Sequence, residues 1–214
     1  MIVVIQCAAR KNPSAGFLRA SSGKRVVFVA NPLRAPEDND VVYAHPDDRD
    51  ADGFSWREKL VTYNKSSDNP FELVEAISLY ENPTYRRLAQ KIRPENLMIL
   101  SAGWGLVPSR FYLPYYDISF SNQAISYAQR KRARTYQDFR LELETDEPVI
   151  FLGGRGYIPL FCELTAMARK RIIYYNSTVP PLAPGCELKR FETTTRTNWH
   201  YECANALIEG KLSV

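Results

Sequence analysis

Short apolar runs, rich in Val and Ile, recur along the chain and are separated by segments with helical patterning. Runs that are nearly continuous in β-branched residues are typical of strands buried within a parallel sheet. Such runs predict strands at residues 2–5, 26–29, 97–100, 149–152 and 172–175. We therefore expect about four to five strands in a central sheet.

Helical patterning fills much of the chain between these runs. Asn followed by Pro is a strong helix start, because Asn caps the first turn and Pro tolerates the first helical position. This signature occurs at Asn69-Pro70 and again at Asn82-Pro83. The sequence predicts helices after residue 55 and over residues 71–77, 84–92, 126–144, 157–169 and 198–209.

Strands that alternate with helices predict right-handed βαβ units. The expected fold class is α/β, a three-layer sandwich whose central, mostly parallel sheet has helices on both faces. In open sheets of this class, ligands bind outside the carboxyl ends of the strands. Three predicted strands end in small or polar residues, at Gln6-Cys7-Ala8, Ser101-Ala102-Gly103 and Gly153-Gly154. Their convergence predicts a polar functional site at that edge.

Residues 31–54 differ in composition from the rest of the chain. Pro32, Pro36, Pro46 and Gly53 lie there among many acidic residues. Because proline and glycine interrupt regular elements, a long surface loop is expected, and loops of that length are usually functional or mobile. The chain as a whole, residues 1–214, is expected to form one domain with 31–54 as an acidic insertion.

The composition is that of an ordinary globular protein, with 45% hydrophobic and 24% charged residues. The formal net charge of +4 is mild, but the positive residues are clustered. One cluster comprises Arg130, Lys131, Arg132 and Arg134, and another covers 169–171. Such clusters attract nucleic-acid phosphates, although a solvated basic helix face would have the same pattern.

Other features limit the cellular context. No apolar run approaches the roughly 20 residues that cross a bilayer, so no membrane partner is expected. The hydrophobic amino terminus lacks a basic flank and is interpreted as a strand rather than a signal peptide. The cysteines, which are Cys7, Cys162, Cys186 and Cys203, show no CxxC pair. We therefore expect free thiols in a reducing cytoplasm, with no metal and no cofactor.

Several clusters of residues are candidates for ligand binding or catalysis. Gly153-Gly154-Arg155-Gly156 lies between a predicted strand and a helix, where free backbone N–H groups could bind an anion. A tight turn that needs glycine is the alternative, and the segment is neither a Walker motif nor GxGxxG. Cys7 is a candidate nucleophile beside Arg10 and Lys11, although a buried structural thiol is the simpler interpretation. His45 and the neighbouring aspartates are weak evidence for a metal site.

The segment from Ser101 to Asp117 contains prolines and aromatic residues that would stiffen it. A carboxylate fixed at Asp117 could stabilise a developing positive charge or orient an attacking water. Trp104, Tyr115 and Tyr116 could stack on a nucleobase. Alternatively, Asp117 caps the next segment and the aromatic rings belong to the core.

Three segments together resemble the YaaA-like family of proteins. Residues 3–11 are similar to a first-strand Cys-x-x-x-Lys motif that ends in Lys11. Residues 98–107 and 114–117 resemble the family's "LSA-x-x-GL" strand-loop and its "PYD" element, here with one extra Tyr. Residues 150–157 resemble its "LGG-x-x-Y" turn. The acidic insertion after the second strand departs from the family pattern.

The resemblance implies a role with nucleic acids. Members similar to YaaA are linked to DNA binding and oxidative DNA damage, and the arrangement resembles that of uracil-DNA glycosylases. By that analogy the chain would be a DNA N-glycosylase that removes a modified base, in DNA repair or in anti-phage defence. The alternatives are a non-catalytic protein that recognises a base or DNA end, and an enzyme that acts on a free nucleotide or nucleoside.

The glycosylase hypothesis assigns a role to each candidate residue. The catalytic candidates are Asp117, Gln6 and Ser101. The base-binding candidates are Cys7, Lys11, Gly103, Trp104, Tyr115 and Tyr116. The phosphate-binding candidates are Gly153, Gly154, Arg155, Arg130, Lys131, Arg132 and Arg134. A flipped base would occupy the strand-end loops while the basic cluster follows the DNA backbone.

Overall fold

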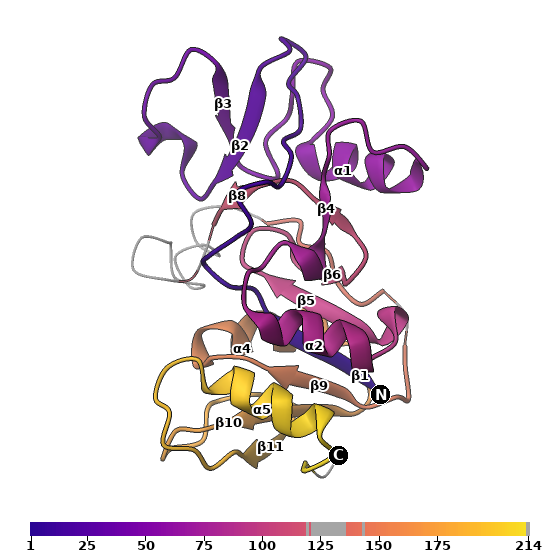
Figure 1. Ribbon diagram of the computed structural model, residues 1–214, viewed down its shortest axis with the longest axis vertical. Coiled ribbons are helices and arrows are strands. Elements are labelled where there is room, and N and C mark those ends of the chain that lie inside the picture. Colours follow the sequence, from indigo (N-terminus) through magenta and orange to yellow (C-terminus); the bar gives the residue numbers. More distant parts are fainter. Residues whose placement is uncertain (119, 121–135, 143, 213–214) are drawn as a thin grey trace.

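The computed structural model describes residues 1–118, 120, 136–142 and 144–212. Two groups of strands lie one above the other along the longest axis of the molecule (Figure 1). The lower group is a six-stranded sheet and the upper group consists of shorter strands beside one helix.

The six-stranded sheet forms the larger part of the core. It is parallel throughout except for its last strand, which runs antiparallel to its neighbour. In spatial order the strands are β11 (Glu187–Arg190), β10 (Arg171–Tyr175), β9 (Val149–Leu152), β1 (Ile2–Gln6), β5 (Leu97–Ser101) and β6 (Gly105–Pro108). Val3, Val4 and Ile5 at its centre are fully buried, as expected for a strand covered on both faces.

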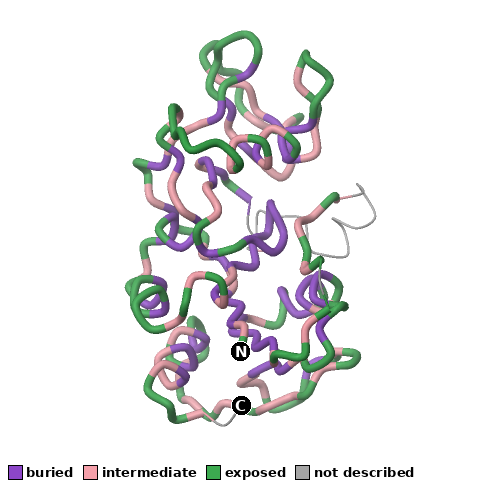
Figure 2. Tube along the Cα trace, turned by 90° about the vertical axis from the view of Figure 1, so that its right-hand side faces the viewer, coloured by how far each residue is buried: buried purple, intermediate pink, exposed green. Residues whose placement is uncertain are grey.

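The upper part contains two small sheets and extends the core. One is parallel and the other is an antiparallel pair. Their strands are β3 (Val41–Ala44), β2 (Arg25–Val29) and β8 (Tyr116–Asp117) in the first, and β4 (Val74–Glu75) and β7 (Tyr112–Leu113) in the second. Buried residues continue through both parts of the molecule, whereas the outer loops are exposed (Figure 2).

Four α-helices and four 3-10 turns complete the described elements. The α-helices are α1 (Trp56–Lys65), α2 (Pro83–Lys91), α4 (Ile158–Leu164) and α5 (Trp199–Ile208). The 3-10 turns are η1 (Pro32–Arg34), η2 (Ala76–Ser78), η3 (Pro94–Asn96) and η4 (Arg155–Tyr157). Helices α2 and α5 lie side by side against the six-stranded sheet (Figure 1).

The starts of two helices follow from local sequence. At α2 the Asn82 side chain accepts a hydrogen bond from the Thr84 amide at 2.9 Å, and Pro83 takes the first position, as predicted. At α1 the Ser55 hydroxyl accepts from the Glu58 amide while the Glu58 carboxylate accepts from the Ser55 amide. This reciprocal capping box fixes where α1 begins.

The predicted helix over 71–77 is wrong. The Asn69 side chain closes a turn instead, accepting from the Leu73 amide and donating to the Leu73 carbonyl, each at 2.8 Å. Glu72 takes a positive φ of 52°, which interrupts helical geometry. The chain then enters β4, so the Asn-Pro signature here marks a turn and not a helix.

The expected loop at 31–54 is only partly a loop. Residues 41–44 form β3, which pairs in parallel with β2. Consequently the predicted strand at 26–29 belongs to this small sheet and not to the central one. The apolar run 41–44 is short and is flanked by prolines and aspartates, so it was not predicted as a strand. Its pairing with β2 makes it one.

Two predicted helices differ from the structure. The helix predicted over 126–144 falls largely on residues outside the described range, and its described residues 136–142 are not helical. Phe139 instead exchanges backbone hydrogen bonds with Trp104 and Leu106, at 3.0 and 2.7 Å. Helix α4 ends at Leu164 rather than 169, because the Leu141 amide donates to the Leu164 carbonyl at 2.9 Å. That bond occupies an acceptor on which a further helical turn would depend.

The expected α/β class with a mostly parallel central sheet is confirmed, although the sheet has six strands rather than four to five. The other predicted strands and the helix at 198–209 correspond to β1, β5, β9, β10 and α5. None of the helices within the described ranges has the length and apolarity that a membrane crossing needs.

Candidate functional site

The carboxyl ends of β1, β5 and β9 meet at one edge of the central sheet, since β1 lies between the other two strands. Gln6 is paired with Leu100, and Ile5 with Leu152, so the residues that follow emerge together. Strand β8 of the upper sheet contributes Tyr116 to the same place. The predicted strand-end site is therefore a real juxtaposition of residues.

A buried chain of hydroxyl groups connects β5 to β8. The Tyr116 hydroxyl lies 2.8 Å from the Ser101 hydroxyl and 2.7 Å from that of Tyr80. Ser101 also accepts hydrogen bonds from the amides of Gly103 and Trp104, at 3.2 and 3.1 Å. A hydroxyl oxygen has two acceptor positions, so Ser101 donates its own proton to Tyr116.

These phenols stay neutral. Burial raises the pKa of both Tyr80 and Tyr116 well above the ordinary value for tyrosine. Ser101 therefore fixes the turn at 101–104 and connects it to two uncharged phenols. Its contacts are those of a group that positions the loop.

Lys11 places an amine beside this chain. The residue is only 6% exposed, and its Nζ lies 4.2 Å from the centroid of the Tyr116 ring. Nζ also donates to the Ala9 carbonyl at 3.3 Å. Burial lowers the pKa of Lys11, while attraction to Cys7 and Asp117 acts in the opposite direction and does not cancel the effect.

Cys7 is a buried residue of the site. It is 1% exposed, and its Sγ lies 3.2 Å from the hydroxyl of Tyr157. Tyr157 follows the Gly153–Gly154 turn, so this contact joins the ends of β1 and β9. Burial raises the pKa of Tyr157 well above its ordinary value, so this neighbour of the Cys7 thiol is also neutral.

Gln6 and Gly154 hold the two strand ends together. The Gly154 amide donates to Gln6 Oε1 at 2.6 Å, and the Tyr85 hydroxyl donates to the Gln6 carbonyl at 2.7 Å. The Gly154 amide is thus already used within the protein. A Cβ at Gly153 would meet the Phe151 ring at 2.3 Å, so this position requires glycine for close packing.

Asp117 and Arg155 are exposed charged residues at this edge. Asp117 ends β8, where it pairs with Val29 of β2. Its carboxylate lies near enough to Lys11 to influence the pKa of that amine. Asp117 is therefore an accessible carboxylate near a buried amine.

Two of the predicted stacking residues point elsewhere. Trp104 is fully buried, and its ring lies 4.9 Å from the Phe28 centroid in an edge-on contact. Tyr115 directly precedes β8, and its ring centroid lies 5.7 Å from that of Phe17. The basic residues Arg130, Lys131, Arg132 and Arg134 lie outside the described residues.

A polar pocket of about 490 Å³ adjoins the site. Tyr80 lines it, and the backbone of Tyr80 is bridged to that of Lys11. Asn12 and Arg86 also line the pocket.

Comparison with known proteins gives no assignment. No family model matches the chain, and no curated protein or solved structure matches it either. The site must therefore be interpreted from its own chemistry.

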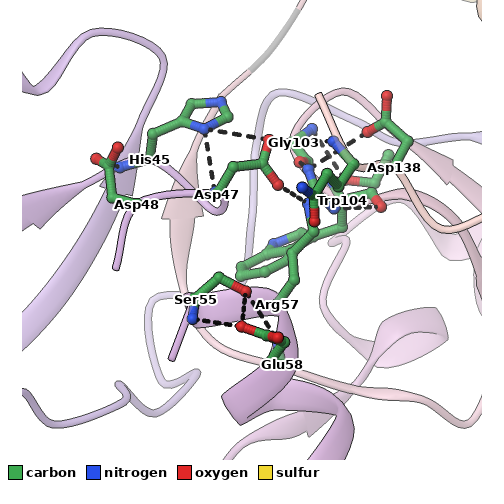
Figure 3. A network of polar contacts seen from close by, with 11 residues as sticks. His45, Asp47, Asp48, Ser55, Arg57, Glu58, Gly103, Trp104 and Asp138 are labelled. Atoms are coloured by element: carbon green, nitrogen blue, oxygen red, sulfur yellow. Dashed lines mark hydrogen bonds and ion pairs between the residues drawn. The ribbon is translucent and has the colours of Figure 1, made fainter. Parts of the chain in front are cut away.

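Sequence reasoning missed Arg57, which anchors the loop after β5. Arg57 is 3% exposed and donates to the carbonyls of Gly103 and Trp104, each at 2.7 Å. Its guanidinium also pairs with the carboxylates of Asp47 and Asp138 (Figure 3). One arginine thus joins α1, the acidic segment and the turn at 103–104.

The acidic segment is organised for this purpose. Asp48 accepts from the His45 amide at 2.7 Å, and the Asp47 amide donates to His45 Nδ1 at 3.2 Å (Figure 3). These bonds hold Asp47 toward Arg57. His45 and its aspartates therefore serve a structural network, and among the described residues no group of His, Cys, Asp and Glu could hold a metal ion.

Tyr80, Tyr85 and Tyr157 were also missed as site residues. Tyr80 and Tyr85 come from the segments around the start of α2, and Tyr157 from η4. Each reaches the site across a large sequence separation, and a lone tyrosine carries no local signal of such a contact.

Proposed function

We propose that the chain is an N-glycosidic-bond hydrolase that acts on DNA and removes a modified base. The observation that carries the proposal is the proximity of an exposed carboxylate, Asp117, to a buried amine, Lys11, at the carboxyl ends of parallel strands. Ligands of open α/β sheets bind at this edge. The proposal includes the cytoplasm as location and the three-layer arrangement of the fold.

The chemistry requires a carboxylate near the sugar. Departure of a base leaves positive charge on the sugar, and a fixed carboxylate stabilises that charge and orients a water molecule. Asp117 has that role in the proposal. Lys11 is a positioning residue in the proposal, because its buried amine lies close enough to attract the carboxylate.

The extruded base would lie in the strand-end loops. Gln6 offers a side chain held at the mouth of the site, and Arg155 is an exposed cation next to it. Arg130, Lys131, Arg132 and Arg134 would contact phosphates further along the DNA.

The test is incubation of the purified chain with DNAs of differing base modification, including heavily modified phage DNA. Abasic sites are scored by alkaline cleavage and released bases by mass spectrometry. Asp117→Asn should abolish release while DNA binding is retained. Asp68→Asn, at an exposed aspartate away from the site, is the matched control. Equal loss of binding and release in Asp117→Asn, or no loss, contradicts the role of Asp117.

The second candidate is a non-catalytic protein that recognises a base or DNA end. The specific observation that favours it is the burial of Cys7, Lys11, Ser101 and Tyr116, which leaves little reactive surface exposed. It predicts salt-sensitive binding to DNA and no product with any substrate. An enzyme on free nucleotides would instead be unaffected when Arg130, Lys131, Arg132 and Arg134 are changed to Glu.

A further inference from the structure

Two cysteines far from the candidate site lie next to each other. Cys162 is in α4, and Cys186 is in the turn directly before β11. Their sulfur atoms are 3.6 Å apart, and both residues are partly exposed. A disulfide has an S–S length of about 2.05 Å, so an approach of about 1.5 Å, within the range of side-chain rotation, would join them.

Arg171 holds the two segments in this arrangement. Its guanidinium donates to the Cys162 carbonyl at 2.9 Å and to the Pro184 carbonyl at 3.4 Å. The turn itself is closed by the Cys186 amide, which donates a hydrogen bond to the Ala183 carbonyl at 3.2 Å. These hydrogen bonds therefore hold Cys186 opposite Cys162.

Gly185 lets the turn lie this close to Arg171. Its φ is +71°, a region that favours glycine, and a Cβ there would meet the Arg171 guanidinium at 2.4 Å. Glycine at this position thus allows both the positive φ and the close approach to Arg171 that place Cys186 next to α4.

The two thiols are chemically unequal. The hydrogen bond from Cys162 lowers the pKa of Cys186 to about 7, against the effect of burial, and the Arg171 cation acts in the same direction. The same interaction, followed by burial, raises the pKa of Cys162. Cys186 is therefore the cysteine of the pair that ionises more readily, with Cys162 as the thiol beside it, which is the arrangement of an attacking and a resolving cysteine.

We propose that Cys162 and Cys186 form a reversible redox site that a hydroperoxide oxidises to a disulfide. The Cys186 thiolate attacks the peroxide, the O–O bond breaks, and an alcohol or water leaves with a proton. Cys186 is then a sulfenic acid. Cys162 sulfur attacks it, the S–O bond breaks, and a second water carries away the hydroxyl and the Cys162 proton. An external dithiol reverses the step by exchange.

Oxidation would attach the edge of the central sheet to a helix. Among the described strands β11 pairs with β10 alone, and it begins at the residue after Cys186. The disulfide would join this edge strand to α4. The remaining cysteines cannot compete, because Cys7 and Cys203 are buried and burial raises the pKa of Cys203 to about 12.

The test treats the full chain with stoichiometric hydrogen peroxide, blocks free thiols with N-ethylmaleimide and maps peptides by mass spectrometry without reduction. A Cys162–Cys186 linked peptide should form and disappear with dithiothreitol. In Cys162→Ser, Cys186 should instead accumulate as a dimedone-trapped sulfenic acid, and in Cys186→Ser neither product should form. Cys203→Ser is the matched control and should behave as the unchanged chain.

A separate measurement follows alkylation of Cys186 in the reduced chain against pH. The rate should rise with a midpoint near the pKa of about 7 and be slower in Arg171→Met. Circular dichroism confirms that each variant is folded. The proposal is overturned if Cys186 proceeds to sulfinic acid without forming the linked peptide, or if peroxide joins other cysteines at equal rate. Neither result depends on DNA or on base release.

Discussion

The network around Arg57 allows the sharpest test of how the candidate site is held together. In Arg57→Met the side chain keeps most of its length but loses every donor. The Gly103 carbonyl would lose its Arg57 donor at 2.7 Å in a buried environment, and the Trp104 carbonyl would keep the Phe139 amide at 3.0 Å but lose its Arg57 donor at 2.7 Å. Asp47, with a side chain only 12% exposed, would keep its charge without the cation that balances it.

The expected cost can be worked from these contacts. A buried carbonyl that loses its donor costs about 1–3 kcal/mol, and removal of one partner from a buried ion pair costs about 3–5 kcal/mol. Because relaxation and entering water recover part of this, we expect the free energy of unfolding to fall by about 4 kcal/mol. That is a large share of the roughly 5–15 kcal/mol of a typical domain.

The assay is equilibrium unfolding in urea followed by tryptophan fluorescence. The midpoint should fall while the slope against urea stays unchanged, since the same surface is exposed on unfolding. Arg93→Met is the matched control, because the Arg93 side chain is 81% exposed and its nearest carboxylate oxygen is 3.9 Å away. We expect its effect to stay within about 0.5 kcal/mol.

A double variant separates charge from packing. If the unpaired Asp47 carboxylate causes much of the loss, Arg57→Met with Asp47→Asn should cost less than the sum of the single changes, by about 1–3 kcal/mol. A loss below about 1 kcal/mol in Arg57→Met, or strict additivity in the double variant, would refute the reasoning.

Three further predictions follow from other contacts. Burial lowers the pKa of His200 to about 4 from 6.5, so the unfolded chain takes up a proton first as pH falls. Stability should be full above pH 6.5 and decline toward pH 4 by about 3 kcal/mol, a loss that is absent from His200→Gln in urea unfolding at several pH values. Gly153→Ala should cost about 1–3 kcal/mol because of the Phe151 ring, whereas Gly156→Ala, with no atom within 4 Å of its Cβ, should be nearly neutral by the same assay. Tyr116→Phe should lower the melting temperature, at a cost of about 1–3 kcal/mol, because the Ser101 and Tyr80 hydroxyls lose a buried partner; equal melting temperatures for Tyr116→Phe and Tyr115→Phe would contradict this.

The central sheet was predictable because its strands are buried on both faces. Runs such as Val3-Val4-Ile5 and Ile172-Ile173 are buried and contain no polar residue, so their composition alone predicts strands. Strand β11 lies at the sheet edge and reads Glu-Leu-Lys-Arg, which has no strand signature. Strand β6 was not predicted, because it is only four residues long and begins and ends with Gly105 and Pro108, residues that are uncommon in strands.

The site was predictable only where topology dictates it. Parallel strands direct Gln6, Ser101 and Gly153 to one edge, whatever fills the rest of the fold. Tyr80 and Arg57 reach the same place from segments whose local sequence gives no indication of their partners. The helix expected after Asn69 failed for a related reason, since the Asn69 side chain bonds Leu73 and the choice between cap and turn depends on contacts elsewhere.

The central position of β1 has a consequence for how the protein is made. Its two neighbours begin at Leu97 and Val149, so the middle of the sheet cannot assemble until the ribosome has released residues beyond 152. Parallel pairing across such sequence separations is slow. During that interval β1 would expose an apolar edge open to association with other chains. The central position of β1 thus lengthens the interval in which the growing chain is open to such association.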